Sequence, residues 1–252
     1  MIWRLLYNWC VVPLGWLVVQ AYGLVNQKAR RAIDGRIDLF ERLRSQVALL
    51  TPSSTRIWFH SSSLGEFEQA KPIIVELKKK HPGVDVIVSF FSPSGYEHSL
   101  TYKLASIITY IPFDSKANAE HFIDLIRPSA AIVVRYDLWP NHIWELKEKK
   151  IPIFIASATL QKSTSRRLPL FYQFHRSLYD CLNYILTVSE EDKHVFETFG
   201  LTKPILHVIG DTRYDQVRRR SEESRLKRVL PARIVDGRKI LVIGSSWADD
   251  ER

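Results

Sequence analysis

His60-Ser61-Ser62-Ser63-Leu64-Gly65-Glu66 joins two patterns that together indicate the fold. The stretch follows the apolar run Arg56-Ile57-Trp58-Phe59, which predicts a strand. It precedes apolar residues at helical spacing that end at Lys78-Lys79-Lys80. Strand-to-helix turns of this kind lie at the carboxyl end of parallel strands, where open α/β sheets bind ligands. Glu66 is therefore a candidate general base, and the N–H groups of the turn are a candidate anion site. The structural alternative is that the serines cap the helix and Glu66 favours its dipole.

Strand and helix patterns alternate along the chain after residue 56. Continuous apolar runs predict further strands at residues 84–91, 107–113, 129–136, 151–157, 184–188 and 205–210. Helical patterns separate most of these runs, at residues 116–127, 139–150, 168–182 and 189–200. The alternation predicts an α/β fold with a Rossmann-like parallel sheet and helices on both faces.

The last 40 residues change character. Residues 212–233 hold eight Lys/Arg against three acidic residues, which predicts a surface helix and a linker. Residues 239–246 then restart the pattern of a strand followed by small residues, but one strand cannot form a domain. We therefore expect the N-terminal part of a longer, two-domain protein. Its expected segments are an anchor helix at 1–26, a basic connecting segment at 27–55, a Rossmann-like domain at 56–211, a basic linker at 212–238 and the start of a second domain at 239–252.

The amino terminus indicates a membrane anchor. Residues 5–25 contain no charged side chain, which is a span of 21 residues. About 20 apolar residues are needed to cross a hydrocarbon core. Lys28, Arg30 and Arg31 follow at once, so the positive-inside rule places the bulk of the chain in the cytoplasm. An interfacial helix that lies on the bilayer and a buried core helix are the alternatives.

Composition restricts the partners and the compartment. The net charge of +9 fits an anionic lipid, a phosphorylated substrate or nucleic acid, but no nucleic-acid-binding motif is present. Two cysteines, Cys10 and Cys181, cannot form a disulfide framework, which favours a reducing compartment. No Cys/His cluster has zinc spacing, so no metal site is predicted.

Five motifs in order, together with the anchor, resemble one family: the 3-deoxy-D-manno-octulosonic acid (Kdo) transferases of lipopolysaccharide synthesis. The first motif, residues 60–66, is similar to the family's His-Ser-x-Ser-x-Gly-Glu. The others are Ser92-Pro93-Ser94-Gly95, Asp137-Leu138-Trp139-Pro140-Asn141, Gly210-Asp211-Thr212-Arg213-Tyr214-Asp215, and Ser245-Ser246 followed by Asp249, Asp250 and Glu251. They are similar to Thr-Pro-Thr-Gly, Glu-Leu-Trp-Pro-Asn, Gly-x-x-Lys-Phe-Asp and Ser-Thr-His-Glu-Gly-Glu, respectively.

The resemblance implies an inverting glycosyltransferase of the two-domain GT-B type. Such an enzyme transfers Kdo from CMP-Kdo to a lipid A precursor (lipid IVA) at the bacterial inner membrane, with its catalytic part on the cytoplasmic face. It implies no metal and no cofactor. Glu66 corresponds to the catalytic base, and Arg213 and Arg135 are candidate cations for the developing negative charge. The candidate acceptor-binding residues are Ser61, Ser62, Ser63, Gly65, Ser94, Gly95 and Asp137, and the candidate donor-binding residues are Ser245 and Ser246.

The chain departs from the family pattern at three positions. Arg135 stands where the family carries a second Glu, so that residue's role cannot be transferred. Strand side chains two residues apart share a face, so Arg135 is expected either to pair with Asp137 or to hold an anion directly. Arg213 replaces a Lys, which keeps the charge but not the geometry, and Trp247 replaces a His.

The basic residues after the anchor have two interpretations. They either dock the domain on anionic lipid or form a solvated flank that sets the topology; these residues are Lys28, Arg30, Arg31, Arg36, Arg42 and Arg44. Two other functions also remain open. The chain could belong to another membrane-associated GT-B enzyme that uses a different nucleotide sugar, or it could be a non-catalytic, membrane-anchored α/β binding module.

Overall fold

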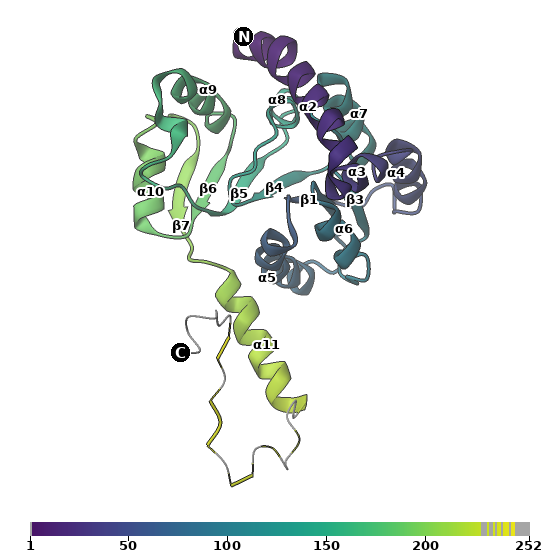
Figure 1. The fold of residues 1–252 in the computed structure, drawn as a ribbon, viewed down its shortest axis with the longest axis vertical. Coiled ribbons are helices and arrows are strands. Elements are labelled where there is room, and N and C mark those ends of the chain that lie inside the picture. The colour runs from purple at the N-terminus through teal and green to yellow at the C-terminus, as the bar shows by residue number, and fades with distance from the viewer. Residues whose placement is uncertain are drawn as a thin grey trace. The chain divides into compact units, whose positions relative to one another are not determined.

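A computed structural model describes residues 2–227 and, beyond them, residues 231, 234, 236–237, 239–241 and 243–244. The chain divides into two compact units, Met1–Arg213 and Tyr214–Arg252. The first unit is an α/β domain with the N-terminal helix beside it (Figure 1). The predicted candidates Ser245 and Ser246, and Trp247, lie outside the described residues.

Seven parallel strands form one sheet in the order β3-β2-β1-β4-β5-β6-β7. The order reverses between β1 and β4, which is the switch point where open α/β sheets bind ligands at the carboxyl ends of their strands. The parallel α/β fold predicted from the alternating pattern is thus confirmed. The strands are β1 (Arg56–Ser61), β2 (Asp85–Phe90), β3 (Ile107–Tyr110), β4 (Ala130–Val134), β5 (Ile153–Ala158), β6 (Tyr184–Thr187) and β7 (Ile205–Val208).

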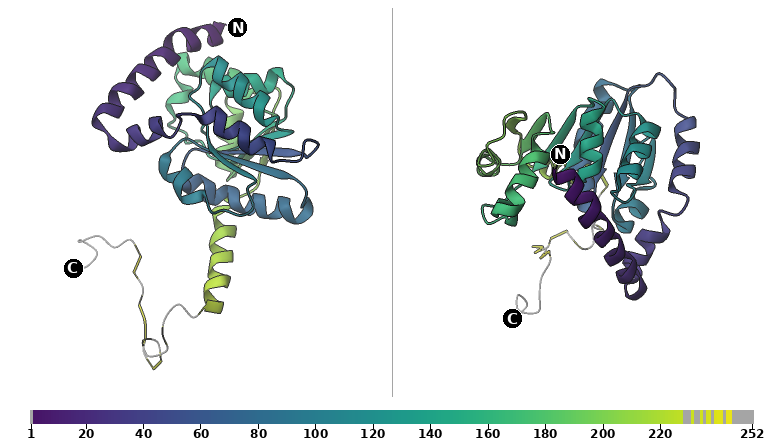
Figure 2. Two further views of the ribbon diagram at one scale, coloured as in Figure 1. Left: turned by 90° about the vertical axis from the view of Figure 1, so that its right-hand side faces the viewer. Right: turned by 90° about the horizontal axis from the view of Figure 1, so that it is seen from above.

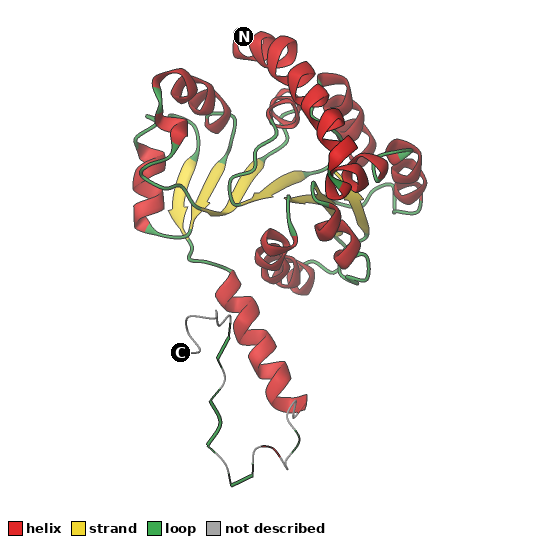
Figure 3. Cartoon of the chain, viewed as in Figure 1, coloured by secondary structure: helices red, strands yellow, loops and turns green. Residues whose placement is uncertain are grey.

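Helices cover both faces of the sheet (Figure 3). Trp58 and Phe59 are consecutive in β1, and they belong to two different hydrophobic clusters because alternate strand residues point to opposite faces. The cluster around Trp58 includes residues of α4 (Leu39–Ala48), α7 (Lys116–Ile126), α8 (Pro140–Glu148), α9 (Pro169–Tyr179) and α10 (Glu190–Glu197). The cluster around Phe59 includes Phe67 and Ile74 of α5 (Leu64–Lys80).

Two parts of the chain hold helices that the sequence patterns did not indicate. The motif Ser92-Pro93-Ser94-Gly95 follows the strand predicted at residues 84–91 and carries no predicted helix. Ser92 instead caps the short helix α6 (Pro93–Ser99), accepting a hydrogen bond from the Gly95 N–H. The segment expected to be connecting chain contains α3 (Gln27–Asp34) and α4. Both are short; α3 packs on the preceding helix α2 (Val12–Val25), and α4 contacts α7 and β3, which lie far away in the sequence.

The amino terminus is one continuous helix, Ile2–Val25, which is long and apolar enough to cross a membrane by length and composition. It consists of α1 (Ile2–Leu6), a π-helical turn (Tyr7–Val11) and α2 (Val12–Val25). None of its most apolar window is buried, so it is not a core helix of the domain. The helix and α3 form a hairpin, which the two views of Figure 2 show from the side and from above.

The second unit begins within α11 (Arg213–Lys227). Within this unit, Arg218 and Arg219 form ion pairs with Glu222 and Glu223, each four residues further along the helix. Of the strand predicted at residues 239–246, residues 239–241, 243 and 244 are described and are not in a strand, and the other positions lie outside the described part of the chain.

Candidate functional site

The candidate site lies at the switch point of the sheet, where the β1–α5 turn meets the loop after β4. The Ser62 hydroxyl in the first loop donates a hydrogen bond to Asp137 Oδ2 in the second. Ser62 and Asp137, 75 residues apart in the sequence, therefore lie at the same edge of the sheet.

Glu66 lies in the first turn of α5, and its two carboxylate oxygens have different environments. Its Oε2 accepts hydrogen bonds from the backbone N–H groups of Ser62 and Ser63, at 2.5 and 3.3 Å. The Ser63 hydroxyl accepts from the Glu66 N–H at 3.4 Å, which completes a capping box. The other carboxylate oxygen, Oε1, has no hydrogen-bond partner among the described residues. The structural interpretation of Glu66 is thus correct, but it accounts for only one of the two oxygens.

The environment of Glu66 raises the pKa of its carboxyl group above the ordinary value of 4.5. The main cause is burial, since the residue is only 8% exposed, and the negative charge of Asp137 acts in the same direction. The backbone N–H groups of Ser62 and Ser63 and the charge of Arg135 oppose the shift. A fixed carboxylate with a raised pKa is a stronger proton acceptor than a solvated one, as general-base catalysis requires.

His60 is a structural member of the site. The Trp139 indole N–H donates to His60 Nε2 at 3.1 Å, so this nitrogen must be the acceptor, and the proton resides on Nδ1, which lies 2.9 Å from Ser89 Oγ. Burial, reinforced by the charge of His142, lowers the pKa of His60 to about 3. His60 is therefore neutral at physiological pH, and it positions Trp139 beside the Asp137 loop.

Asp137 is a partly buried carboxylate whose pKa is raised, mainly by desolvation. The charge of Arg166 opposes the shift. Of the two alternatives given for Arg135, the pairing with Asp137 is not formed, because no ion pair joins these two residues. The cause lies in the backbone: β4 ends at Val134 and Arg135 has a φ of +70°, so the alternation of side chains stops before Arg135.

Arg135 adopts this left-handed conformation while its N–H donates to the Ala156 carbonyl at 2.8 Å. Its guanidinium lies over the Tyr136 ring, 5.4 Å from the centroid. The buried Nε has no hydrogen-bond partner among the described residues. A strained backbone holding an unsatisfied cation is typical of a functional position.

A second arginine, Arg166, faces the same ring at 5.3 Å and donates to the Tyr136 carbonyl at 3.4 Å. A polar cavity of about 450 Å³ opens between the two arginines, and its described lining contains no carboxylate. The other polar side chains that line it are Thr159, Gln161, Thr164 and Ser165. Arg166 was missed from the sequence because it lies in a loop after β5, inside a run of polar residues without a distinguishing pattern.

Arg213 is connected to the Glu66 helix through Asp211. Its guanidinium pairs with Asp211 Oδ2 at 2.9 Å, and Gln69 of α5 donates to Asp211 Oδ1 at 2.8 Å. Burial raises the pKa of Asp211, but the hydrogen bonds from Arg213 and Gln69 outweigh this effect and hold the pKa below its usual value. Gln69 follows Glu66 by three residues, so it shares a helix face with the candidate base. No local sequence pattern singles out Gln69.

The remaining candidates divide by their contacts. A Cβ on Gly95 would lie 2.6 Å from Phe90 Cδ1 and 3.2 Å from the Leu64 backbone nitrogen, so close packing requires glycine there. A Cβ on Gly65 would meet only Ser63 Oγ, at 4.0 Å, so packing does not explain that glycine. Ser61 is fully buried and its hydroxyl has no partner among the described residues. Ser94 Oγ lies 3.4 Å from Ser92 Oγ.

In the part of the chain that the structure describes, no group of three or more His, Cys, Asp or Glu side chains is arranged to hold a metal ion. The site is thus made of carboxylates, hydroxyls and arginines. Such a set can accept a proton and stabilise an anion.

Comparison with known proteins agrees with this chemistry. Residues 36–216 match the family model described as 3-deoxy-D-manno-octulosonic-acid transferase (kdotransferase). The 3-deoxy-D-manno-octulosonic acid transferase of Haemophilus influenzae is 26% identical over 214 residues, which cover 84% of this chain and 49% of that protein. The transferase of Aquifex aeolicus is 29% identical over 147 residues, covering 57% of this chain and 37% of that protein. The chain spans about half the length of the curated relatives it matches, or less.

The fold has a counterpart among solved structures. The UDP-GlcNAc 2-epimerase of Neisseria meningitidis aligns with a TM-score of 0.52 and 15% identity, over 69% of this chain and 52% of that one. At this identity the likeness concerns the fold alone. The family model, by contrast, covers most of the chain, including the candidate base and Arg213. The chain therefore belongs to the 3-deoxy-D-manno-octulosonic acid transferase family.

Proposed function

We propose that this chain is the acceptor-side half of a two-domain, inverting glycosyltransferase that transfers Kdo from CMP-Kdo to a lipid A precursor such as lipid IVA. The single observation that carries the proposal is the state of Glu66. One carboxylate oxygen is fixed by two backbone N–H groups, the other has no partner among the described residues, and the group is buried at the switch point with a raised pKa.

The proposed reaction needs a base because a sugar hydroxyl is a weak nucleophile. Glu66 Oε1 takes the proton of the acceptor hydroxyl while the hydroxyl oxygen forms a bond to the anomeric carbon of Kdo. The bond between that carbon and the phosphate oxygen of CMP breaks on the opposite face, and CMP departs with the electron pair. The configuration of the anomeric carbon is thereby inverted.

Negative charge grows on the departing phosphate, and fixed cations would stabilise it. Arg213 is our first candidate, because Asp211 and Gln69 fix it beside the Glu66 helix. Arg135 is the second, because it lies close enough to Glu66 to lower the pKa of that carboxyl group. Asp137 and the hydroxyl and glycine positions of the two turns are proposed to contact the acceptor. Ser245 and Ser246 are proposed to contact the donor. We place this half on the cytoplasmic face of the inner membrane.

The test is an assay of the complete two-domain enzyme with CMP-Kdo and lipid IVA. Transfer of Kdo by the wild-type enzyme and its loss in Glu66→Gln would support the proposal. Transfer from a different nucleotide sugar alone would favour another glycosyltransferase, and acceptor binding without any transfer would favour a binding module. Residues 1–252 by themselves should bind acceptor but not turn over CMP-Kdo. Turnover by this piece alone would contradict the two-domain organisation.

A further inference from the structure

The geometry points to an N-terminal helix that lies in the plane of the membrane and does not cross it. Both ends of the helix Ile2–Val25 are attached to the same α/β domain, and the exposed apolar stretch between them is proposed to insert into the interface of an anionic bilayer. The inference concerns how the domain is held on lipid, so it goes beyond the reaction proposed above and does not depend on it.

The length of the helix alone permits either orientation. Its 24 residues extend about 36 Å at 1.5 Å per residue, which exceeds a hydrocarbon core of about 30 Å. Its contacts decide between the two orientations. A helix that crosses the bilayer has its ends on opposite sides, so only one end can contact a given soluble domain.

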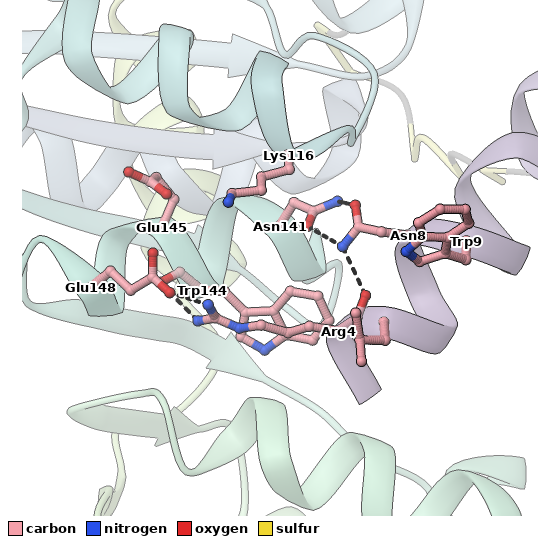
Figure 4. A pocket seen from close by; sticks show the side chains of 9 residues that line it. Arg4, Asn8, Trp9, Lys116, Asn141, Trp144, Glu145 and Glu148 are labelled. Atoms are coloured by element: carbon pink, nitrogen blue, oxygen red, sulfur yellow. Dashed lines mark hydrogen bonds and ion pairs between the residues drawn. The ribbon is translucent and has the colours of Figure 1, made fainter. Parts of the chain in front are cut away.

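The first end of the helix is attached to α8 by polar side chains (Figure 4). Asn8 and Asn141 exchange two amide hydrogen bonds, each of 3.0 Å. Arg4 forms an ion pair with Glu148, and its guanidinium lies over the Trp144 ring. These residues form a polar side at the start of the helix, and this side faces the domain.

Tyr7 extends this attachment into the buried interior of the domain. Its hydroxyl donates to Asp114 Oδ2 at 2.8 Å. Asp114 is only 6% exposed and also accepts from the Asn141 backbone and from His142 Nδ1. The ring of Tyr7 packs edge-on against Trp144 at 5.7 Å. The π-helical turn that begins at Tyr7 contains Asn8 as well, and an inserted turn of this type often marks a functional position.

The other end of the helix returns to the domain through the α2–α3 hairpin. A Cβ on Gly23 would lie 2.6 Å from Ile33 Cδ1, so the two helices are in close contact. Arg31 of α3 pairs with Glu97 of α6 at 3.6 Å. A Cβ on Gly35 would lie 2.6 Å from the Tyr110 ring, so the chain after α3 packs directly on the end of β3.

Arg36 completes this second attachment, and neither of its two predicted roles, docking on lipid or lying in a solvated flank, applies because its side chain is bound within the domain. Its guanidinium donates to the carbonyls of Ile111, Phe91 and Ala32 at 2.8, 3.0 and 2.7 Å. Burial lowers its pKa to about 10. A crossing helix would keep this attachment but would carry Arg4, Tyr7 and Asn8 to the far side of the membrane. Asp114, Asn141 and Glu148 would then lose these partners.

The middle of the helix is apolar and is exposed on all sides, with residues 13–18 forming an uninterrupted exposed run. Leu14, Leu17 and Val18 are more than half exposed, and they are accompanied by the exposed aromatic rings of Trp9, Trp16 and Tyr22. Amphipathic aromatic rings prefer the interface between lipid and water. Lys28 and Arg30 are exposed in the adjoining α3, where they can meet anionic headgroups. The exposed apolar stretch and its cationic flank together fit an anionic phospholipid surface.

Crosslinking in native membranes tests the attachment of the first end. In a background with Cys10→Ser and Cys181→Ser, the pair Asn8→Cys/Asn141→Cys is treated with a short bis-maleimide. We expect an intramolecular crosslink within the membrane-bound protein, and none for the control pair Val18→Cys/Asn141→Cys. Absence of the crosslink from a folded Asn8→Cys/Asn141→Cys protein, whose cysteines each react with a monofunctional maleimide, would overturn the proposal.

Labelling with a membrane-impermeant maleimide provides a second readout that leaves Asn141 unchanged. Single cysteines at Ile2, at Gln27 and at exposed Lys162 of the domain are labelled in sealed vesicles of each orientation. An in-plane helix requires all three positions to react from the same side. Reaction of Ile2→Cys from the side opposite to Lys162→Cys would show a crossing helix, and a chain lacking its first residues would show a cleaved signal sequence. Either result would overturn the proposal.

Vesicle sedimentation tests the lipid that the surface recognises. Lys28→Gln/Arg30→Gln should weaken binding to phosphatidylglycerol vesicles by about fivefold per charge removed, and should leave binding to phosphatidylcholine vesicles unchanged. Equal binding to both vesicle types before and after the substitution would overturn the anionic-lipid assignment. None of these measurements uses Kdo transfer, so failure here and failure of the proposed function are separate outcomes.

Discussion

Glu66 Oε2 lies 2.5 Å from the backbone nitrogen of Ser62, within the turn whose helix the same carboxylate caps. The candidate base is thus held by the element it stabilises, and its two roles can be separated chemically. Glutamine completes a capping box as glutamate does, but its neutral amide cannot take up the acceptor proton.

Glu66→Gln is therefore expected to lower kcat by about 10²–10⁴-fold while the protein stays folded. The raised pKa of Glu66 supports this expectation: the folded state binds the carboxyl proton more tightly than the unfolded state, so ionisation lowers stability as the pH rises through the folded-state pKa. Removing the charge should not destabilise the protein at neutral pH. Ser63→Ala measures the contribution of the helix cap to stability alone, with an expected cost of about 1 kcal/mol. Wild-type turnover by folded Glu66→Gln would exclude Glu66 as the base.

The pH profile should report the neighbours of Glu66. The base acts only when it is ionised, so kcat/KM should fall on the acid side of the profile. The fall should centre on a pKa above the ordinary value of 4.5, because burial raises the pKa of Glu66. Asp137→Asn removes a negative charge that raises this pKa, so the acid limb should move to lower pH. Arg135→Gln removes a positive charge that lowers it, so the limb should move to higher pH. Shifts in the same direction, or no shift in either variant, would contradict the assigned geometry.

The two site glycines should respond oppositely to alanine. Gly95→Ala should destabilise the protein, because its Cβ would lie 2.6 Å from the Phe90 ring and 3.2 Å from the Leu64 backbone. Gly65→Ala should leave the melting temperature unchanged or raise it, since its Cβ meets only one atom, at 4.0 Å. If acceptor approaches this turn closely, Gly65→Ala should raise the acceptor KM. Unchanged kinetics in Gly65→Ala would remove Gly65 from the site.

Local patterns predicted the sheet and the Glu66 turn well. The runs in β1, β2 and β4 are apolar on both faces, and the Ser63 cap with Glu66 three residues later is a strong helix-start signal. Contacts between residues that lie far apart in the sequence could not be predicted from local patterns. The chain after β5 brings Arg166 to the Tyr136 ring. Gln69 belongs to the site because it donates a hydrogen bond to Asp211, which lies 142 residues further along the chain. No local pattern encodes either contact.

The error at Arg135 has the same physical origin. The predicted pairing with Asp137 assumed that the strand continues through both residues, but β4 ends one residue earlier and Arg135 takes a positive φ. The apolar run does not set the boundary of the strand: the Arg135 N–H still donates to the Ala156 carbonyl of β5, but the positive φ of Arg135 turns the chain out of the strand at this residue.

Arg213 provides the last test, because its charge and its geometry can be changed separately. Arg213→Ala should lower kcat on the order of 10²-fold if the guanidinium meets charge on the departing phosphate. Arg213→Lys should retain a good part of the rate, because a point charge remains although the two-nitrogen contact with Asp211 at 2.9 and 3.0 Å is lost. Stability should change by less than about 1 kcal/mol, since the pair is partly exposed. Arg218→Ala removes an exposed charge from the same helix and should behave as wild type. Rates for Arg213→Ala equal to those of Arg218→Ala would exclude Arg213 from the site and leave Arg135 as the next cation to test.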